Sequence, residues 1–423
     1  MKRLLLFVLT VAVMVAGAVW LADRPGEVTV HWQGWRVDTT VPVLLLALLL
    51  LLAVLEVLLR LGRVVVGGPG RLLAARRARR VRDGYRALSD GLAAVAAGNR
   101  EASRKLAKKA DRLLADRSLT GLLTAQAAEL SGDQAEARRR FEDMVGRPET
   151  AFLGLKGLLD LALKDNDLDK ALDYARRAWA LQPGEGLAAT LFELQAGAGQ
   201  WSEAELTLDE ARRRKAMTLP DLGRRRALVL DARAAAAEAA NASDALALAV
   251  KAHEADPAFV PATVRAARLL TTAGKDRKAR AIVEAAFRIS PHPELAAAWA
   301  ALVPAESPLD RVKRMERLVK GNPQSPVSHI ALAEAALAAR LWGQARSHLE
   351  TALGQRKSPA AYRLLARIER DEKKDEAAAQ GWLAKATEAA ADPAWLCTRC
   401  NGQAAEFSPA CPHCGAVDAL VWR

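Results

Sequence analysis

The chain is poor in aromatic residues and in cysteine for its length. Aromatic side chains make up 5% of the 423 residues, and the protein has only four cysteines and six histidines. The sequence lacks a strand–GxGxxG–helix fingerprint, a Gly-x-Ser-x-Gly context, and any pair of histidines at i, i+4 spacing. These absences argue against a dinucleotide-binding enzyme, a serine hydrolase of that type and a helical metal site. We therefore predict that the protein is not an enzyme.

Alanine is abundant instead, and it recurs with a period. Between residues 86 and 390 the same order repeats about every 34 residues: a turn with Gly or Asn, small residues at helical spacing, then in several copies a proline. We define the frame of the repeat by a marker residue, which is the first small residue in the second helix of each unit. The markers are Ala102, Ala137, Ala171, Ala204, Ala245, Ala279, Ala345 and Ala377, with a degenerate copy near Arg311. The spacing predicts an array of about eight to nine helix–turn–helix units over residues 87–391.

Small residues at these positions have a physical reason. Two antiparallel helices approach closely only where the side chains between them are small, and stacked pairs share one continuous core. The array resembles the tetratricopeptide family. That resemblance implies an all-α solenoid with a concave groove that binds peptides or protein partners.

Two apolar runs precede the array. Residues 4–20 and 41–59 are almost wholly apolar, and the second run is long enough to cross a hydrocarbon layer of about 30 Å. We predict a transmembrane helix hairpin with a short external loop over residues 1–66. The alternative for the first run is a cleaved signal ending near Ala16-Gly17-Ala18. Basic residues flank both outer ends, so both termini and the repeat array are expected on the cytoplasmic side of a bacterial inner membrane.

A strongly basic stretch follows the second run. We predict a juxtamembrane helix over residues 67–86 whose basic side chains contact anionic lipid headgroups: Arg71, Arg76, Arg77, Arg79, Arg80 and Arg82. Gly67-Gly68-Pro69-Gly70 is expected to form a linker at its start. The alternative is that these basic residues serve only as the topological stop that ends the second membrane span. Nucleic acid is not expected as a partner, because no aromatic residues interleave with the arginines.

The loop between the two runs carries a recognisable motif. Residues 28–32 and 35–37 alternate around Gln33-Gly34, which predicts a small β-hairpin. The chain contains, in order, the first apolar run, Leu21-Ala22-Asp23-Arg24-Pro25-Gly26-Glu27-Val28, Trp32-Gln33-Gly34-Trp35, the second apolar run, the basic segment and the repeats. This order resembles that of the proteobacterial haem-biosynthesis-associated HemY family. The resemblance implies a scaffold or regulator acting with late protohaem-synthesis enzymes. It does not imply the flavin-dependent oxidase that shares the family's name.

The last segment, residues 392–423, differs from the rest. It contains two Cys-x-x-Cys pairs, Cys397 with Cys400 and Cys411 with Cys414. The spacing predicts a four-thiolate tetrahedral site that holds zinc, with iron as the alternative. Disulfides or free thiols are the other interpretation, and a cytoplasmic location disfavours disulfides. Because four thiolates leave no open position, the predicted role is structural.

The residues around the cysteines narrow the interpretation further. Asn401 and Gly415 stand where Cys-x-x-Cys-His would place histidine, which excludes c-type haem attachment. Trp395, Phe407 and Trp422 are expected to form a small core. The segment resembles the rubredoxin-like zinc ribbon that ends the lipopolysaccharide-assembly repeat protein LapB. We expect the ribbon to cap the array or to contact a client.

These predictions combine into one hypothesis with two alternatives. The first is an inner-membrane-anchored scaffold for late haem-synthesis enzymes. The second is a LapB-like envelope or lipopolysaccharide-assembly adaptor, which the second apolar run disfavours. The third is a haem-binding carrier that would need groove histidines such as His253 or His329, although the histidines lie singly in the repeats. No haem or porphyrin ligand, client identity or oligomeric state is assigned from the sequence.

Overall fold

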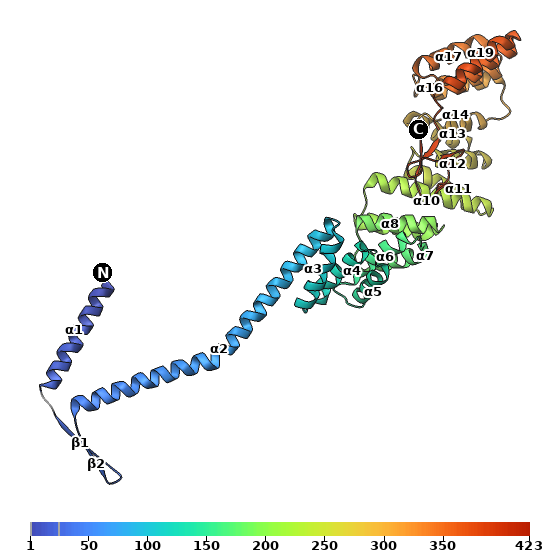
Figure 1. Cartoon of the computed structure of the whole chain (residues 1–423). Helices are drawn as coiled ribbons and strands as arrows, with labels where there is room; N and C mark the ends of the chain where they lie inside the picture. The colour runs from blue at the N-terminus through green and yellow to red at the C-terminus, as the bar shows by residue number, and fades with distance from the viewer. Residues whose placement is uncertain (1, 24–25) are drawn as a thin grey trace. The chain divides into compact units, whose positions relative to one another are not determined.

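The computed structural model describes residues 2–23 and 26–423, so Arg24 and Pro25 of the loop motif lie outside the described residues (Figure 1). Within this part the chain forms two compact units, one ending at Gly132 and the other spanning Asp133–Arg423. Helices dominate both units. Strands occur in the described residues only in a hairpin near the N-terminus and in the C-terminal segment.

The first unit begins with a helix and a hairpin. Helix α1 spans Lys2–Ala22, and strands β1 (Glu27–Trp32) and β2 (Trp35–Thr40) pair antiparallel. Trp32 stands opposite Trp35, and the two connecting residues have positive φ, 49° at Gln33 and 85° at Gly34. This backbone geometry matches the twist of the flanking strands and confirms the predicted hairpin.

Helix α2 (Val41–Ala96) contains the clearest candidate for a membrane span. Its segment Val41–Leu61 is long and apolar enough to cross a membrane by length and composition. The apolar part of α1, Leu5–Trp20, is shorter than 18 residues, so in the described residues one helix meets that criterion, and the first span stays a prediction. The expected linker at residues 67–70 is instead helical, because the leucine-rich run before it and the Ala/Arg-rich run after it both favour helix.

The remainder of the first unit packs three helices together. Helices α3 (Arg100–Leu113) and α4 (Arg117–Leu130) bury Ala107, Ala110 and Leu123 in a cluster that also includes Ala87 of α2. The predicted marker Ala102 is only half-buried, whereas Ser103 is fully buried. Ser103 lies 34 residues before Ala137, so the true frame of this copy is shifted by one residue.

The second unit is an α-solenoid of antiparallel helices followed by a small ribbon (Figure 1). Helix α5 comes first, and the helices after it form consecutive antiparallel pairs. A short π-helical turn, η1, separates the two helices of the last pair. The elements are α5 (Gln134–Val145), α6 (Ala151–Lys164), α7 (Leu168–Leu181), α8 (Glu185–Gly197), α9 (Trp201–Arg213), α10 (Leu219–Ala239), α11 (Ala245–Ala255), α12 (Val260–Thr272), α13 (Asp276–Ile289), α14 (Pro293–Ala301), α15 (Pro308–Val319), α16 (Pro326–Ala338), α17 (Trp342–Gln355), α18 (Pro359–Ile368), η1 (Glu369–Lys373) and α19 (Glu376–Glu388).

The alanine frame of this unit is the predicted one at most positions. Six marker residues are buried: Ala137, Ala171, Ala204, Ala245, Ala279 and Ala345. In the degenerate copy, Val312 of α15, beside Arg311, is buried at the corresponding position of the frame. Ala377 is exposed, and Ala379, 34 residues after Ala345, is buried in its place. The markers failed only at the two ends of the array, where neighbouring small residues made the frame ambiguous.

The turns inside the pairs use left-handed residues, as the sequence predicts for Gly and Asn. Positive φ occurs at Asn166, Gly199, Asn241 and Gly274, and also at two long basic residues, Arg340 and Lys374. Side-chain caps such as Asp167, which accepts from the Lys170 N–H, then start the second helix. Each turn therefore ends one helix and begins the next within a few residues.

Helix α6 approaches α5 so closely that only glycine fits at Gly154. A Cβ atom there would lie 2.7 Å from the Phe141 carbonyl oxygen and 2.9 Å from the Val145 nitrogen. We expect Gly154→Ala to lower the free energy of unfolding by about 1–3 kcal/mol, because the backbone of α5 must move. Urea denaturation followed by circular dichroism measures this loss.

The matched control for this prediction is Gly381→Ala in α19. A Cβ atom at Gly381 would have nothing within 4 Å, so the substitution should raise stability by up to about 1 kcal/mol through helix propensity. Equal effects of the two substitutions would contradict the close approach at Gly154.

The C-terminal ribbon is a three-stranded antiparallel sheet. Strands β3 (Trp395–Cys397), β4 (Gln403–Ala404) and β5 (Leu420–Trp422) are arranged in the order β4-β3-β5. Trp395 and Leu420 are buried, and Phe407 and Trp422 pack half-buried against them. The predicted small core is therefore confirmed.

Candidate metal centre

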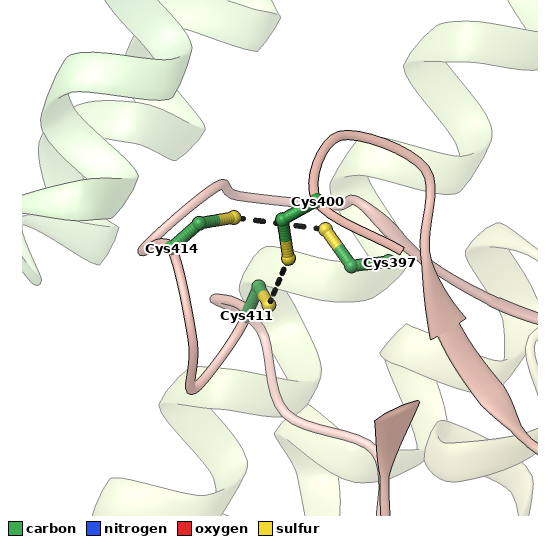
Figure 2. Close-up of side chains that lie close together, drawn as sticks. All are labelled: Cys397, Cys400, Cys411 and Cys414. Atoms are coloured by element: carbon green, nitrogen blue, oxygen red, sulfur yellow. Dashed lines mark hydrogen bonds between the residues drawn. The ribbon is translucent and has the colours of Figure 1, made fainter. Parts of the chain in front are cut away.

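The four cysteines of the ribbon converge on one point (Figure 2). All four Sγ atoms lie within 4.8 Å of one another. Cys397 Sγ is 3.7 Å from Cys414 Sγ, and Cys400 Sγ is 3.8 Å from Cys411 Sγ. A disulfide needs about 2.05 Å, whereas four thiolates bound tetrahedrally at about 2.3 Å from zinc lie about 3.8 Å apart. The geometry fits a tetrahedral metal ion and does not fit disulfides.

Each Cys-x-x-Cys pair forms a tight turn, here called a knuckle, and a residue with positive φ follows each pair. Asn401 and Gly415 have φ values of 56° and 71°. The N–H groups of Arg399, Gly402 and His413 point at sulfur, each with a 3.4 Å distance to the Sγ of the cysteine two residues earlier. Such N–H donors stabilise thiolate over thiol.

The negative charges of the ionised thiols favour a bound cation. Backbone N–H groups, that of Cys400 foremost, lower the pKa of the Cys397 thiol to about 6 against the opposing effect of burial. The Gly402 N–H also lowers the pKa of Cys400, but burial and the neighbouring thiols of Cys414 and Cys397 prevail and raise it to about 12. Thiolates this close repel one another, so all four ionise together only when a cation balances their charge. The residues therefore fit a divalent metal ion.

His413 lies inside the second knuckle, but the residues that group together as potential metal ligands are the four cysteines. Its Nε2 is 2.8 Å from the Gln403 carbonyl oxygen, and its ring packs over Gly402. It therefore joins the second knuckle to β4 through a hydrogen bond, and the candidate ligands are the four thiols.

The ribbon packs on the middle of the solenoid. The Trp395 indole Nε1 donates to Glu294 Oε1 of α14 at 2.8 Å, and Phe407 meets Phe259, the residue preceding α12, edge to face at 5.1 Å. Arg224 of α10 pairs with Asp418 of the ribbon at 3.1 Å. The expectation that the ribbon caps the array is therefore wrong: apolar and charged partners on α10, α12 and α14 hold it against the central repeats.

His292 completes this contact. It is buried at the start of α14, where its Nδ1 accepts the Glu294 N–H at 3.1 Å, and its ring lies 4.3 Å from that of Trp422. Burial lowers the pKa of His292 to about 4, so the ring is neutral at physiological pH. It acts as a helix cap and packing surface for the ribbon.

The repeat histidines do not all lie singly, contrary to the sequence-based expectation. His253 is buried and hydrogen-bonded to Thr263 at 2.8 Å, which makes it a core residue. His329 and His348 lie with their Nδ1 atoms 3.3 Å apart. They belong to the neighbouring helices α16 and α17, so a search for i, i+4 spacing within one helix could not detect them.

The predicted lipid-contacting arginines lie on α2. Arg76, Arg77, Arg79, Arg80 and Arg82 are exposed, and the side chain of Arg71 lies outside the described residues. Arg80 has an additional structural role, because its Nη2 donates to the Arg112 carbonyl oxygen at the end of α3 at 2.7 Å. Contact of these arginines with lipid stays a prediction.

Comparison with known proteins identifies relatives of the chain. The family model described as HemY protein N-terminus matches residues 26–132. The probable magnetosome protein Mms48 of Magnetospirillum gryphiswaldense is 29% identical over 428 residues, covering 99% of this chain and 93% of that protein.

Solved structures give weaker similarities. A tetratricopeptide repeat protein from Parabacteroides merdae is 14% identical, with a TM-score of 0.29, and the match covers 56% of this chain and 98% of that one. The TPR2AB domain of yeast Sti1, in its pHSP90 complex, is 14% identical with a TM-score of 0.28, and the match covers 72% of this chain and 98% of that one. Residues 26–132 therefore match the HemY N-terminal model, and the chain continues from this region into an α-solenoid of paired helices and a four-cysteine ribbon.

Proposed function

We propose that the protein is a non-enzymatic scaffold of the bacterial inner membrane that organises late protohaem-synthesis enzymes. The observation that carries this proposal is the match of residues 26–132 to the HemY N-terminus, which includes the apolar segment Val41–Leu61 and leads into the repeats. An anchored solenoid presents a long surface to protein clients while it keeps them at the membrane.

The proposed topology has two spans, with both termini and the repeats in the cytoplasm. The segments are an anchor over residues 1–66, a basic segment over residues 67–86 that contacts anionic lipid, the repeats over residues 87–391 and the ribbon over residues 392–423. The flanking basic residues support this orientation. Arg76, Arg77, Arg79 and Arg82 face solvent on α2, where they could reach headgroups.

The ribbon is proposed to hold zinc through Cys397, Cys400, Cys411 and Cys414, with iron as the alternative ion. Sulfur separations of 3.7 and 3.8 Å support a closed tetrahedral site. Four thiolates leave no open position for water or substrate, which supports a structural and not a catalytic role. The bound ion would hold the ribbon against α10, α12 and α14.

A second candidate function follows from the relative that spans nearly the whole chain. Mms48 is named a probable magnetosome protein, so a magnetosome-associated role of this chain is the second candidate. The LapB-like adaptor stays a further alternative because of the ribbon. A haem carrier is the least supported, since His253 is a core residue bonded to Thr263.

Depletion of the protein tests the proposal, with porphyrins, haem and lipopolysaccharide measured in the same cells. A haem-synthesis scaffold predicts accumulated porphyrin precursors with normal lipopolysaccharide. The reverse pattern would support the envelope adaptor instead.

A further inference from the structure

The hairpin of β1 and β2 has one apolar face and one polar face. Residues that stand opposite each other in an antiparallel pair share a face, and the faces alternate along each strand. One face carries the pairs Val28–Thr39, Val30–Val37 and Trp32–Trp35. The other face carries the pairs Glu27–Thr40, Thr29–Asp38 and His31–Arg36. The large apolar side chains of the hairpin therefore belong to one side of a sheet that is only two strands wide.

The apolar face is uncovered in the described residues, except at its base. Val28 and Thr39, next to the ends of the hairpin, are half-buried. Toward the turn, Val30 is 44% exposed, Val37 56% and Trp35 79%. A hairpin of two strands has no second layer on which to bury such a face, and alone in water it is marginally stable at best. The face therefore needs a partner outside the hairpin.

The opposite face is suited to water. Arg36 Nε lies 3.1 Å from Asp38 Oδ1, and both side chains are exposed. Thr29 and His31 of β1 are exposed on the same face. A partner that covers only the apolar face would leave this ion pair and these polar groups hydrated.

The chain holds the hairpin at one end of the candidate membrane span. Strand β2 ends at Thr40 and α2 begins at Val41, and the Val41 N–H donates to the Gly26 carbonyl oxygen at 3.0 Å. The 21 residues of Val41–Leu61 rise about 31 Å as a helix, which matches a hydrocarbon layer of about 30 Å. With this segment across the bilayer, Val41 lies at the edge of the hydrocarbon and the base of the hairpin lies among the headgroups.

We propose that the hairpin lies along the bilayer surface, with its apolar face in the interface between the headgroups and the acyl chains. Its six-residue strands are about 20 Å long, whereas the headgroup layer is only about 5–8 Å deep. An upright hairpin would hold Trp35 in water beyond the headgroups. A flat hairpin places Val30, Trp35 and Val37 on lipid, and tryptophan is enriched at that depth.

The partner of this surface is therefore the lipid of the leaflet on the loop side of the membrane. This placement rests on the membrane anchor of the proposed function, because Val41–Leu61 must cross the bilayer for the hairpin to reach the interface. It adds a second contact with the membrane, separate from the arginines of α2.

Photocrosslinking of the full chain in nanodiscs of phosphatidylethanolamine and phosphatidylglycerol tests the proposal. A genetically encoded aliphatic diazirine residue takes the place of Val37 in one sample and of Arg36, its neighbour on the polar face, in the other. Lipid adducts, measured by mass spectrometry, should be about tenfold or more frequent at position 37, because only the apolar face of an interfacial element is buried in lipid. Water quenches the diazirine at position 36, so this sample gives the background.

Hydrogen exchange of the hairpin amides in the same nanodiscs gives a second measurement. Val30→Asn combined with Val37→Asn should raise exchange in β1 and β2 about tenfold or more, because lipid no longer stabilises the hairpin. Thr29→Asn combined with His31→Asn is the matched control on the polar face, and it should change exchange by no more than about twofold.

Retention of the chain in the nanodiscs is measured in every sample, which separates this proposal from the anchor itself. An anchored chain with equal lipid adducts at positions 36 and 37 would overturn the hairpin placement and leave the anchor intact. Loss of the chain from the nanodiscs would refute both. The crosslinking is repeated in cell membranes, where adducts from position 37 to a protein instead of lipid would show that a protein covers this face and would also overturn the proposal.

Discussion

Replacing both Cys397 and Cys411 with serine is expected to abolish metal binding, from about one ion per chain to nearly none. The two thiols are buried and come from different knuckles, so no pair of neighbouring ligands is left intact. The metal binding energy of such small sites is also their folding energy, about 10–16 kcal/mol in isolated zinc fingers. The ribbon should therefore unfold while the helices keep their own cores.

Hydrogen exchange and elemental analysis together measure this outcome. Protection should fall in β3 and β5 and, more weakly, in the parts of α10, α12 and α14 that the ribbon covers, where Phe259 loses Phe407 and Glu294 loses Trp395. Exchange in α16 and α17 should not change. Thr398→Ser, between the ligands of the first knuckle, is the control. Retention of one ion per chain in the double variant would refute the four-thiolate site.

Replacement of Arg314 with leucine is expected to destabilise the chain by about 3–5 kcal/mol, the cost of breaking a buried ion pair. The Arg314 side chain is 6% exposed and its partner Glu306 is 9% exposed. Arg314 Nε donates to Glu306 at 2.8 Å, and its Nη atoms donate to the carbonyl groups of Trp299 and Ala300. Leucine removes the Arg314 donors from all three acceptors, and Glu306 keeps only its longer contact with the more exposed Arg311 at 3.4 Å.

The effect of this substitution should depend on pH in a defined direction. Hydrogen bonds from Arg314 are the main cause of the lowered pKa of Glu306. A lowered pKa in the folded state contributes stability that is present at neutral pH and is lost as the pH falls through that pKa. The difference between wild type and variant should therefore be largest near pH 7 and shrink below about pH 4.

Urea denaturation at the two pH values measures both effects. Arg311→Leu is the matched control, because Arg311 contacts the same carboxylate at 3.4 Å but is 31% exposed. Its loss should cost no more than about 1 kcal/mol. A similar cost for the two variants, or a difference that grows in acid, would contradict the assignment of Arg314 as the buried partner.

Local patterns were the part of the structure that the sequence predicted well. Gln33-Gly34 predicted the hairpin turn, buried alanines such as Ala171 predicted the repeat frame, and Gly and Asn residues such as Asn166 predicted the turns inside the repeats. Each of these depends on a few neighbouring residues whose backbone preference or size decides the outcome.

Contacts between distant segments were not predictable in the same way. Nothing local in Asp418 or Phe407 indicates that they meet Arg224 and Phe259. The pairing of His329 with His348 likewise depends on how two helices pack.

The role that we propose for the protein is a membrane-anchored scaffold for late haem-synthesis enzymes. The most direct measurement is the porphyrin and haem profile of depleted cells, complemented either by the full chain or by residues 87–423 alone, with lipopolysaccharide measured alongside. We expect accumulated porphyrin precursors, normal lipopolysaccharide, and rescue by the full chain only. Normal porphyrins with altered lipopolysaccharide, or equal rescue by the chain without its anchor, would contradict it.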